Sequence, residues 1–229
     1  MIMLRSWNQL PEDMRCDEVR PYYDYLSQKR VSLFIKRVFD VIASLLFLII
    51  LSPLILVLSV WIKIDSKGPV VFKQKRVTQY GRIFDIYKFR TMVQNAEQIG
   101  TQVTVKNDAR ITKAGQKLRN YRLDEILQLV NILKGDMTFV GTRPESVKYV
   151  QAYSKEMKAT LLLPAGVTSV ASIRYKDEDK LLDGAKDIDA EYINHVLPEK
   201  MKYNLEEIYR FSFGHDLIVM IQTFLAVLH

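Results

Sequence analysis

The most restrictive feature of the sequence is an apolar run from Val41 to Ile62, VIASLLFLIILSPLILVLSVWI, which contains no charged residue. A helix needs about 20 such residues to cross the hydrocarbon core of a bilayer. About forty polar or mixed residues precede the run, and it is longer than the apolar part of a cleaved signal peptide. The sequence therefore predicts a membrane element that remains in the protein.

Ser52-Pro53 lies at the middle of the run and leaves two topologies open. Proline removes a backbone donor and kinks or breaks a helix. Each half has about eleven residues and spans roughly 16 Å, about half of the roughly 30 Å hydrocarbon core. The two topologies are a helix-break-helix hairpin that dips into one leaflet and returns, and a kinked single span, since membrane helices tolerate proline.

Basic residues flank the apolar run on both sides. A crossing helix normally has its basic flank on the cytoplasmic side only, so two basic flanks favour a hairpin with both ends at one leaflet. Asp40 follows Lys36 and Arg37 at helix-neighbour spacing, and we expect it at headgroup level rather than in a catalytic role. The flanking cations are Lys29, Arg30, Lys36 and Arg37 before the run, and Lys63, Lys67, Lys73, Lys75 and Arg76 after it.

The net charge points to anionic partners. The chain has 33 Lys and Arg against 26 Asp and Glu, giving a formal charge of +7. Such a surplus suits nucleic acid, anionic lipid or a phosphorylated substrate. No recognised nucleic-acid-binding motif is present, and the basic residues border an apolar anchor, so no nucleic-acid partner is expected. The single cysteine, Cys16, excludes an internal disulfide.

The remaining sequence predicts a small β element among helices. VVFKQKRV and RIFDIYKF have the residue types of short strands, and the intervening QYG makes a hairpin plausible. Helices are expected around residues 112–121, from 123 to about 134, over 146–162, and over 190–194 and 198–209. The C-terminal stretch from His215 has one broad apolar face, which suits either packing on the core or lying on a membrane.

Two adjacent carboxylates, Asp124 and Glu125, open the helix that begins at Leu123. Acids in a first turn can simply complement the helix dipole, and adjacent residues do not share a helix face. In a basic setting, however, such a pair could also bind Mg²⁺ beside substrate phosphates, or supply a carboxylate nucleophile. The nearby cations could be phosphate ligands, or a solvated or headgroup-binding patch; they include Arg76, Arg82, Lys88, Arg90, Arg110, Arg119, Arg122 and Arg143.

Several ordered motifs resemble one protein family. The chain is similar, from about Lys36 to its C-terminus, to the bacterial sugar transferases, the monotopic phosphoglycosyl transferases that begin lipid-linked glycan assembly. The similarity rests on KRVFDVIAS, the central Ser52-Pro53, KGPVVFKQKRV, YGRIFDIYKFRTM, DARITKAGQKLRNYRLDEILQLVNILKGDMTFVGTRPE and HDLIVMIQTFLAVL. With no multi-span module before the membrane segment, the chain looks like the small, catalytic-core form.

The resemblance implies an α+β, mostly α fold with a re-entrant membrane helix hairpin broken at Ser52-Pro53, a small β element and interfacial amphipathic helices. It implies an N-terminal extension over 1–28, a basic flank and membrane helix over 29–64, and a cytoplasmic catalytic domain over 65–229. The expected location is the cytoplasmic face of a bacterial inner membrane. The oligomeric state is undetermined, with a homodimer as one option.

The resemblance also implies a mechanism. Asp124 would attack the phosphate that carries the sugar in a UDP-sugar, releasing UMP, and polyprenol phosphate would then take the phosphosugar. Glu125 would assist in metal binding or proton handling, and Asp124 and Glu125 would hold Mg²⁺. Phosphate-binding residues would be Arg119 and, less directly indicated, Arg143, Lys88 and Arg90.

This sequence departs from the family pattern in places. The family usually has serine at Arg122, proline at Leu127 and a second proline at Thr142. Residues 163–179 also lack the usual Gly-Trp-Ala-Gln stretch, so we assign no sugar or nucleotide contacts there. Neither the sugar nor the pathway is predicted. Two other readings are a non-enzymatic membrane-anchored protein that binds anionic lipid or a partner, and an enzyme that acts on a different phospholipid head group.

Overall fold

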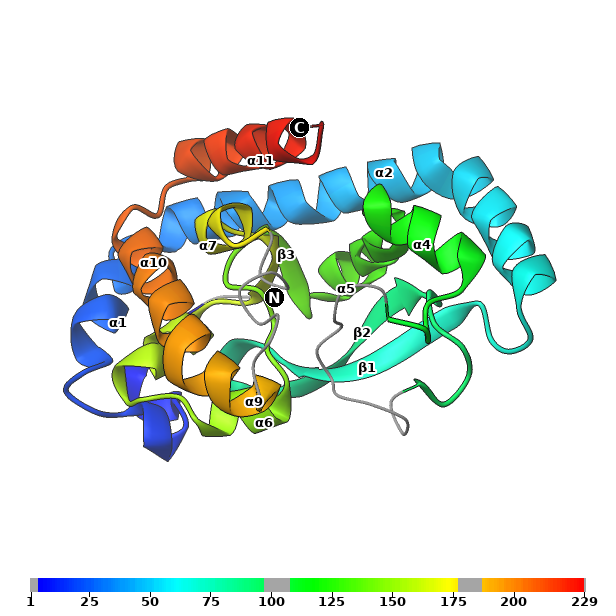
Figure 1. Cartoon of the computed structure of the whole chain (residues 1–229). Coiled ribbons are helices and arrows are strands. Elements are labelled where there is room, and N and C mark those ends of the chain that lie inside the picture. Colours follow the sequence, from blue (N-terminus) through cyan, green and yellow to red (C-terminus); the bar gives the residue numbers. More distant parts are fainter. Residues whose placement is uncertain (1–3, 97–107, 177–186, 229) are drawn as a thin grey trace.

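The apolar run forms part of one long helix, α2 (Arg30–Asp65), in the computed structural model, which describes residues 4–96, 108–176 and 187–228. Pro53 lies inside this helix, so the predicted break into two helices is absent, and α2 instead bends where its colour turns to cyan (Figure 1). A proline is a known cause of such a bend. Within the described residues, only α2 is long and apolar enough to cross a membrane, and 11% of its most apolar window is buried.

Both ends of α2 are tied to the rest of the protein. Near its start, Arg37 donates to the carbonyl oxygens of Ile132 at 2.7 Å and Leu133 at 3.1 Å. At its end, Arg90 donates to the carbonyl oxygens of Ile62 at 3.2 Å and Ser66 at 2.6 Å. These bonds add side-chain donors to carbonyl oxygens near helix C-terminal ends, of which those of Ile62 and Ile132 also accept backbone bonds from Ser66 and Gly135.

A buried polar cluster attaches the first half of α2. Asp40 is 3% exposed and accepts hydrogen bonds from Thr138 Oγ1 at 2.6 Å and from the Phe139 amide at 3.4 Å. Lys36 forms an ion pair with Asp216, and both side chains are buried. Asp40 is therefore buried within the protein and joins α2 to β3 (Met137–Val140), where its carboxylate finds donors; its level relative to the headgroups stays a prediction.

Two small β elements follow α2 among the described residues. The predicted hairpin is confirmed: β1 (Val71–Val77) pairs antiparallel with β2 (Ile83–Phe89), with Gln74 opposite Ile86. Its turn uses left-handed backbone at Tyr80 (φ 60°) and Gly81 (φ 73°). A second, parallel pair joins β3 to β4 (Ala165–Thr168), which the sequence analysis did not predict.

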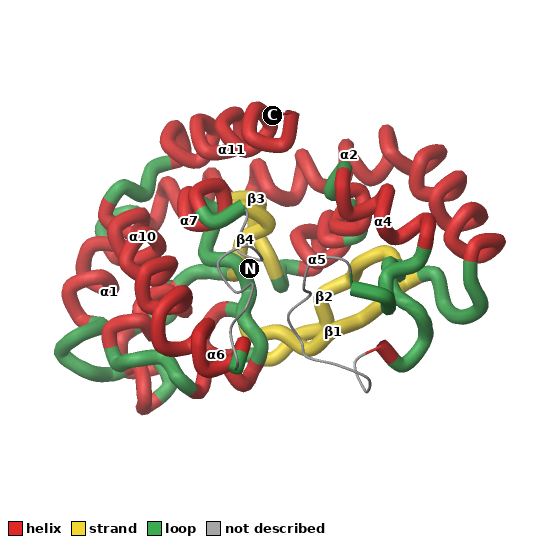
Figure 2. Tube along the Cα trace, in the orientation of Figure 1, coloured by secondary structure: helices red, strands yellow, loops and turns green. Residues whose placement is uncertain are grey.

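Helices surround these strands, as Figure 2 shows, and the chain is mostly helical as predicted. The expected helix over 146–162 divides in two, and Asp124 and Glu125 lie in a short 3-10 turn before the α-helix. The helices are α1 (Arg20–Ser27), α4 (Lys113–Asn120), η4 (Leu123–Glu125), α5 (Gln128–Lys134), α6 (Val147–Gln151), η5 (Glu156–Leu162), α7 (Val170–Arg174), α9 (Ile188–Glu191), η6 (Tyr192–Val196), α10 (Leu197–Tyr209) and α11 (Phe213–Leu228).

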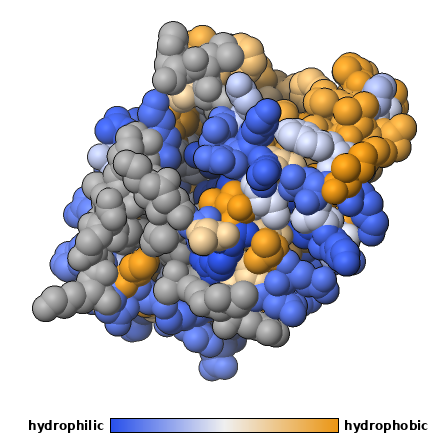
Figure 3. All heavy atoms as spheres, turned by 45° about the vertical axis from the view of Figure 1, so that its right-hand side comes forward, coloured by the Kyte–Doolittle hydropathy of each residue, from blue (hydrophilic) through white to orange (hydrophobic). Residues whose placement is uncertain are grey.

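The core and the apolar surface lie in different parts of the chain. The N-terminal segment packs into the main core beside η5 and α10, burying Leu10, Met14, Val19 and Leu26. By contrast, α2 exposes many large apolar side chains, and α11 exposes Ile218, Ile221, Phe224 and Leu225. Figure 1 shows α11 beside α2 on the side opposite the β1–β2 hairpin, and Figure 3 shows apolar residues gathered at its upper right.

Candidate active site

A backbone reversal presents the acidic pair. Helix α4 ends at Asn120, and Arg122 then takes a left-handed conformation with φ 54° and ψ 20°. A residue other than glycine rarely adopts this conformation, and such strain gathers at functional sites. The reversal leads directly into the η4 turn, where Asp124 is 8% exposed and the Glu125 side chain is 12% exposed.

Glu125 is held by two cations from other elements. Lys88 Nζ lies 3.1 Å from Glu125 Oε1, and Arg143 Nη2 lies 2.5 Å from the same oxygen. Arg143 Nη1 also reaches Glu125 Oε2 at 3.4 Å. Burial alone would raise the pKa of Glu125, but the charges of Arg143 and Lys88 hold it well below its ordinary value. Glu125 is therefore a fixed anion.

Asp124 has the opposite environment. Burial and the neighbouring Glu125 charge raise the pKa of Asp124, while Lys88, Arg119 and Arg122 oppose that rise. Among the residues that the structure describes, its carboxylate has no hydrogen-bond partner. A buried carboxylate that is neither locked in an ion pair nor hydrogen-bonded can attack a substrate, so the two adjacent acids suit different tasks.

The predicted phosphate ligands occupy distinct positions. Lys88 and Arg143 meet at Glu125, whereas Arg119 donates to Thr91 Oγ1 at 2.9 Å. Burial lowers the pKa of Arg119, and the Asp124 charge is the strongest influence opposing this. Burial also lowers the pKa of Lys88, with the Glu125 charge opposing. The structure thus surrounds the acidic pair with cations from β2, α4 and the loop after β3.

Arg90 has a different role from the one predicted. It is 5% exposed, and its terminal nitrogens donate to backbone oxygens of Ile62, Ser66 and Pro69. These bonds attach the end of α2 to the hairpin. The position of Arg90 gives no support to a direct phosphate contact.

The loop that carries Arg143 is placed by close backbone packing. Gly141 donates to the Thr168 carbonyl oxygen at 2.9 Å, and Gly166 donates to the Thr142 carbonyl oxygen at 2.8 Å. A Cβ on Gly166 would lie 2.2 Å from the backbone of Gly141, so a side chain there would push the two segments apart. The predicted motif residues around Arg143 thus depend on β4 for their position.

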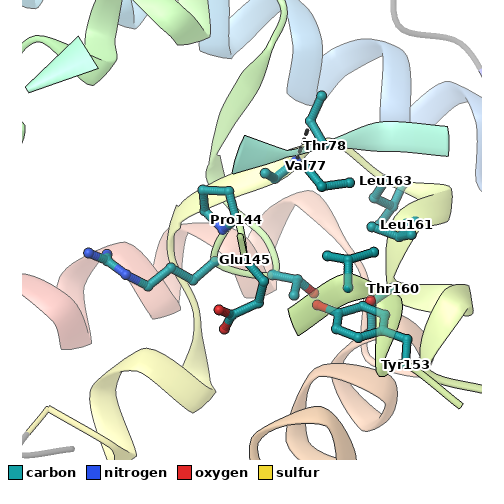
Figure 4. Close-up of a pocket in the computed structure, with 12 residues that line it drawn as sticks. Val77, Thr78, Pro144, Glu145, Tyr153, Thr160, Leu161 and Leu163 are labelled. Carbon is teal, nitrogen blue, oxygen red and sulfur yellow. Dashed lines mark hydrogen bonds between the residues drawn. The ribbon is translucent and has the colours of Figure 1, made fainter. Parts of the chain in front are cut away.

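Two further charged groups lie near the site: Arg76, which sequence reasoning included only among the nearby cations, and Glu145, which it did not assign. Arg76 donates a hydrogen bond to Gln74. The charges of Glu145 and Arg143 both act on the pKa of Arg76, so it lies near both residues. Glu145 is 6% exposed and follows Arg143 by two residues. That spacing was the available signal, because residues two apart in an extended segment point to the same side. Figure 4 shows Pro144 and Glu145 on one side of a small pocket that does not include the acidic pair.

The acidic pair offers a partial set of metal ligands. Within the described part of the chain, no group of three or more His, Cys, Asp or Glu side chains could hold a metal ion. Mg²⁺ is commonly bound by one or two carboxylates together with waters and substrate phosphates. Asp124 fits that pattern because its oxygens are not engaged, whereas the Glu125 oxygens are shared with Lys88 and Arg143.

Comparison with known proteins agrees with the motifs. An enzyme of Aeromonas hydrophila, UDP-N-acetylgalactosamine-undecaprenyl-phosphate N-acetylgalactosaminephosphotransferase, is 45% identical over 54% of this chain and 29% of its own length. The UDP-glucose:undecaprenyl-phosphate glucose-1-phosphate transferase of Escherichia coli is 34% identical over 93% of this chain and 44% of its own length. Undecaprenyl-phosphate galactose phosphotransferase of Salmonella typhimurium is 35% identical over 66% of this chain and 34% of its own length.

This chain therefore spans less than half of the length of these relatives. The match to the family itself is much broader. The model of the family described as bacterial sugar transferase matches residues 31–229, which include the acidic pair and every cation placed around it. The chain belongs to the bacterial sugar transferase family.

Proposed function

We propose that the protein transfers a sugar 1-phosphate from a UDP-sugar to polyprenol phosphate through a covalent intermediate on Asp124. The observation that carries this proposal is the contrast within the acidic pair. Glu125 is locked between Lys88 and Arg143, while Asp124 is buried among cations without a hydrogen bond in the described structure. The relatives are named as undecaprenyl-phosphate sugar phosphotransferases, which supports the same reaction class.

The reaction proceeds in two displacements. An Asp124 carboxylate oxygen forms a bond to the phosphorus that carries the sugar, and the bond from that phosphorus to the bridging oxygen breaks. UMP leaves with the electron pair. A phosphate oxygen of polyprenol phosphate then bonds to the same phosphorus, which releases the Asp124 carboxylate and yields polyprenol diphosphate sugar. One site can thus serve a soluble donor and a lipid acceptor in turn.

The cations around the acidic pair can stabilise the negative charge that develops on the donor phosphates during transfer. Arg119 and Lys88 lie where their charges act on Asp124, so they can hold a donor phosphate beside it. Arg143, which is paired with Glu125, adds a further positive charge beside the donor phosphates. Bound Mg²⁺ would neutralise part of the diphosphate charge, with Asp124 as its protein ligand; Glu125 would join it only by exchanging a bond to Lys88 or Arg143.

The attachment of α2 supports a re-entrant arrangement. Arg37 and Asp40 tie its beginning, and Arg90 ties its end, to the same folded body, with Leu58 and Ile62 packed against Phe89 and Leu118. A helix held at both ends by one body keeps both ends on one side of the bilayer. We place that body on the cytoplasmic face of the inner membrane, with the exposed side of α11 at the interface.

The test is to detect the intermediate directly. The protein is incubated with Mg²⁺ and UDP-N-acetylgalactosamine, UDP-glucose or UDP-galactose, without lipid acceptor, and its peptides are weighed. We expect a phosphosugar on the peptide that contains Asp124 with one donor. Asp124→Asn should abolish both the adduct and transfer, while Asp85→Asn, which removes a carboxylate paired with Lys75 on the hairpin, should retain both.

The other outcomes separate the alternatives. No adduct and no UMP release with polyprenol phosphate present, for any of these donors, would count against the transferase. Membrane binding retained by such an inactive chain would favour a non-enzymatic anchored protein. An adduct that survives Asp124→Asn would place the nucleophile elsewhere.

A further inference from the structure

A buried ionic cluster lies behind the loop that carries Arg143. Tyr192 donates from its hydroxyl to Glu145 Oε1 at 2.7 Å, and Lys200 Nζ donates to the Tyr192 hydroxyl at 2.7 Å. Lys200 Nζ also lies 3.3 Å from Glu145 Oε1. The three residues are 2–6% exposed, so the cluster is shielded from water.

The cluster joins segments that are far apart in sequence. Glu145 lies between β3 and α6, Tyr192 begins η6, and Lys200 lies in α10. The Glu145 carbonyl oxygen also accepts a hydrogen bond from the Val77 amide at 3.0 Å, which links the loop to the end of β1. Glu145 therefore fixes the loop through its backbone and its side chain together.

Such a cluster is a poor source of net stability. Buried ion pairs lose much of their attraction to desolvation, and apolar residues of similar volume often serve as well. Their better supported role is to specify one arrangement over others. Here the cluster would specify the position of the loop that carries Arg143, which forms an ion pair with Glu125.

We propose that Glu145 is a positioning residue that, clasped by Tyr192 and Lys200, holds the loop so that Arg143 meets Glu125 beside Asp124. This inference rests on the proposed transferase function. It assigns a reason for the Arg-Pro-Glu sequence: Arg143 pairs with Glu125, Pro144 restricts the backbone, and Glu145 bonds to Tyr192 and Lys200. Glu145 acts through Arg143 and does not touch the substrate.

The first experiment is a double-mutant cycle on transfer activity. Glu145→Gln keeps the shape of the side chain and removes its charge. Misplacement of a site group can cost up to about 10²-fold in rate, and we expect kcat to fall by about 10- to 100-fold. In an Arg143→Ala background the same change should cost less than about threefold, because coupled residues are not additive. Equal losses in both backgrounds would overturn the proposal.

The matched control is Glu156→Gln. Glu156 also accepts a hydrogen bond from a tyrosine hydroxyl, that of Tyr22 at 2.7 Å, but it lies at the start of η5 and its bond is to α1 rather than to Tyr192 or Lys200. We expect near-normal kcat from this variant. Should Glu145→Gln fail to fold, Tyr192→Phe removes a single oxygen from the cluster and enters the same cycle with the same expected non-additivity.

A second readout does not depend on transfer. Phenylglyoxal modifies accessible arginines, and peptide masses give the rate at each one. Glu145→Gln should make Arg143 react faster while Arg82, which pairs with Asp136 at 2.8 Å, keeps its rate as an internal standard. An unchanged Arg143 modification rate would overturn the positioning role of Glu145, whether or not the wild-type chain transfers sugar. Absence of sugar transfer by the wild-type chain would count against the proposed function instead.

Discussion

The long apolar helix α2 is largely exposed and the mixed N-terminal segment is largely buried, which is the reverse of what their compositions suggest. Helix α2 is the most apolar part of the chain, yet Ile42, Ile49 and Leu56 are 62–65% exposed. The mixed, polar segment before it buries Met14 and Leu26 at 0–1% exposure. Exposure of so much apolar surface is unfavourable in water. The difference in exposure therefore indicates that α2 has apolar surroundings, whereas the N-terminal segment packs within the protein.

The comparison also separates two kinds of attachment. The N-terminal segment is held by side chains packed in the core, including contacts of Tyr22 with Tyr209. The first half of α2 is held to the same body by the charged groups Lys36, Arg37 and Asp40 and by aromatic contacts with Phe139, while many of its other apolar side chains stay exposed. A helix that must keep apolar faces toward lipid can use its few polar residues for docking.

The largest expected effect comes from breaking the polar attachment of α2. Lys36→Met leaves Asp216 as a buried charge without its partner, which typically costs about 3–5 kcal/mol. We expect that loss in the free energy of unfolding, measured by chemical denaturation in mild detergent. Lys36→Met combined with Asp216→Leu removes both charges and should recover most of it; a double variant as unstable as the single one would show that the pair is not the attachment.

A matched pair of leucines tests the contrast between the two regions. Leu26 is fully buried, and Leu26→Ala should cost about 2–5 kcal/mol through the lost burial and the cavity left behind. Leu56 is 65% exposed, and Leu56→Ala should change the free energy of unfolding by less than about 0.5 kcal/mol in detergent. Similar losses at both positions would mean that α2 contributes its apolar side chains to a protein core.

A third prediction concerns α11. Phe224 is 65% exposed on the side that we place at the membrane, and removing a phenylalanine from an apolar phase costs about 1.5–3 kcal/mol. Phe224→Ser should therefore weaken binding to anionic vesicles by roughly 10- to 100-fold. The control is Ile83→Ser: Ile83 is 52% exposed at the start of β2, and Figure 1 shows the β1–β2 hairpin on the side of α2 opposite α11. Equal weakening by both variants would contradict the assigned orientation.

The sequence predicted local features well because they depend on local patterns. The hairpin, the apolar membrane-type segment within α2 and the helical character of residues 197–209 follow from strand-like runs, apolar length and helical periodicity. The acidic pair and its cations were identified from motifs, and the structure brings Lys88 and Arg143 to Glu125 across long sequence separations.

The misses required knowledge of tertiary contacts. Nothing local distinguishes Asp40 as a buried acceptor for Thr138, or Arg90 as a ligand of the α2 carbonyls. The parallel pairing of Met137–Val140 with Ala165–Thr168 joins two short runs, each too brief to give a strand pattern. The burial of the N-terminal segment depends on the surface that α10 and η5 offer, which its own mixed sequence does not reveal.

The smallest effect tests a polar bond within the packed N-terminal segment. Tyr22 donates to Glu156 Oε1 at 2.7 Å, so Tyr22→Phe should cost about 0.5–1.5 kcal/mol of unfolding free energy at neutral pH. Burial, and then the bond to Glu156, raises the pKa of Tyr22 above its ordinary value. The unfolded chain therefore ionises this tyrosine first, near pH 10.

That ordering sets the sign of the pH dependence. A raised folded pKa gives stability that is complete below about pH 10 and declines as the pH rises further. Phenylalanine has no such titration, so the advantage of the wild type over Tyr22→Phe should shrink above pH 10, as followed by denaturant midpoints at each pH. Leu26→Ala, which removes packing from the same segment without a titrating group, should keep a constant difference over that range. A shrinking difference for both variants would mean that the whole segment loosens at high pH, and that its attachment depends on charge in the way the attachment of α2 does.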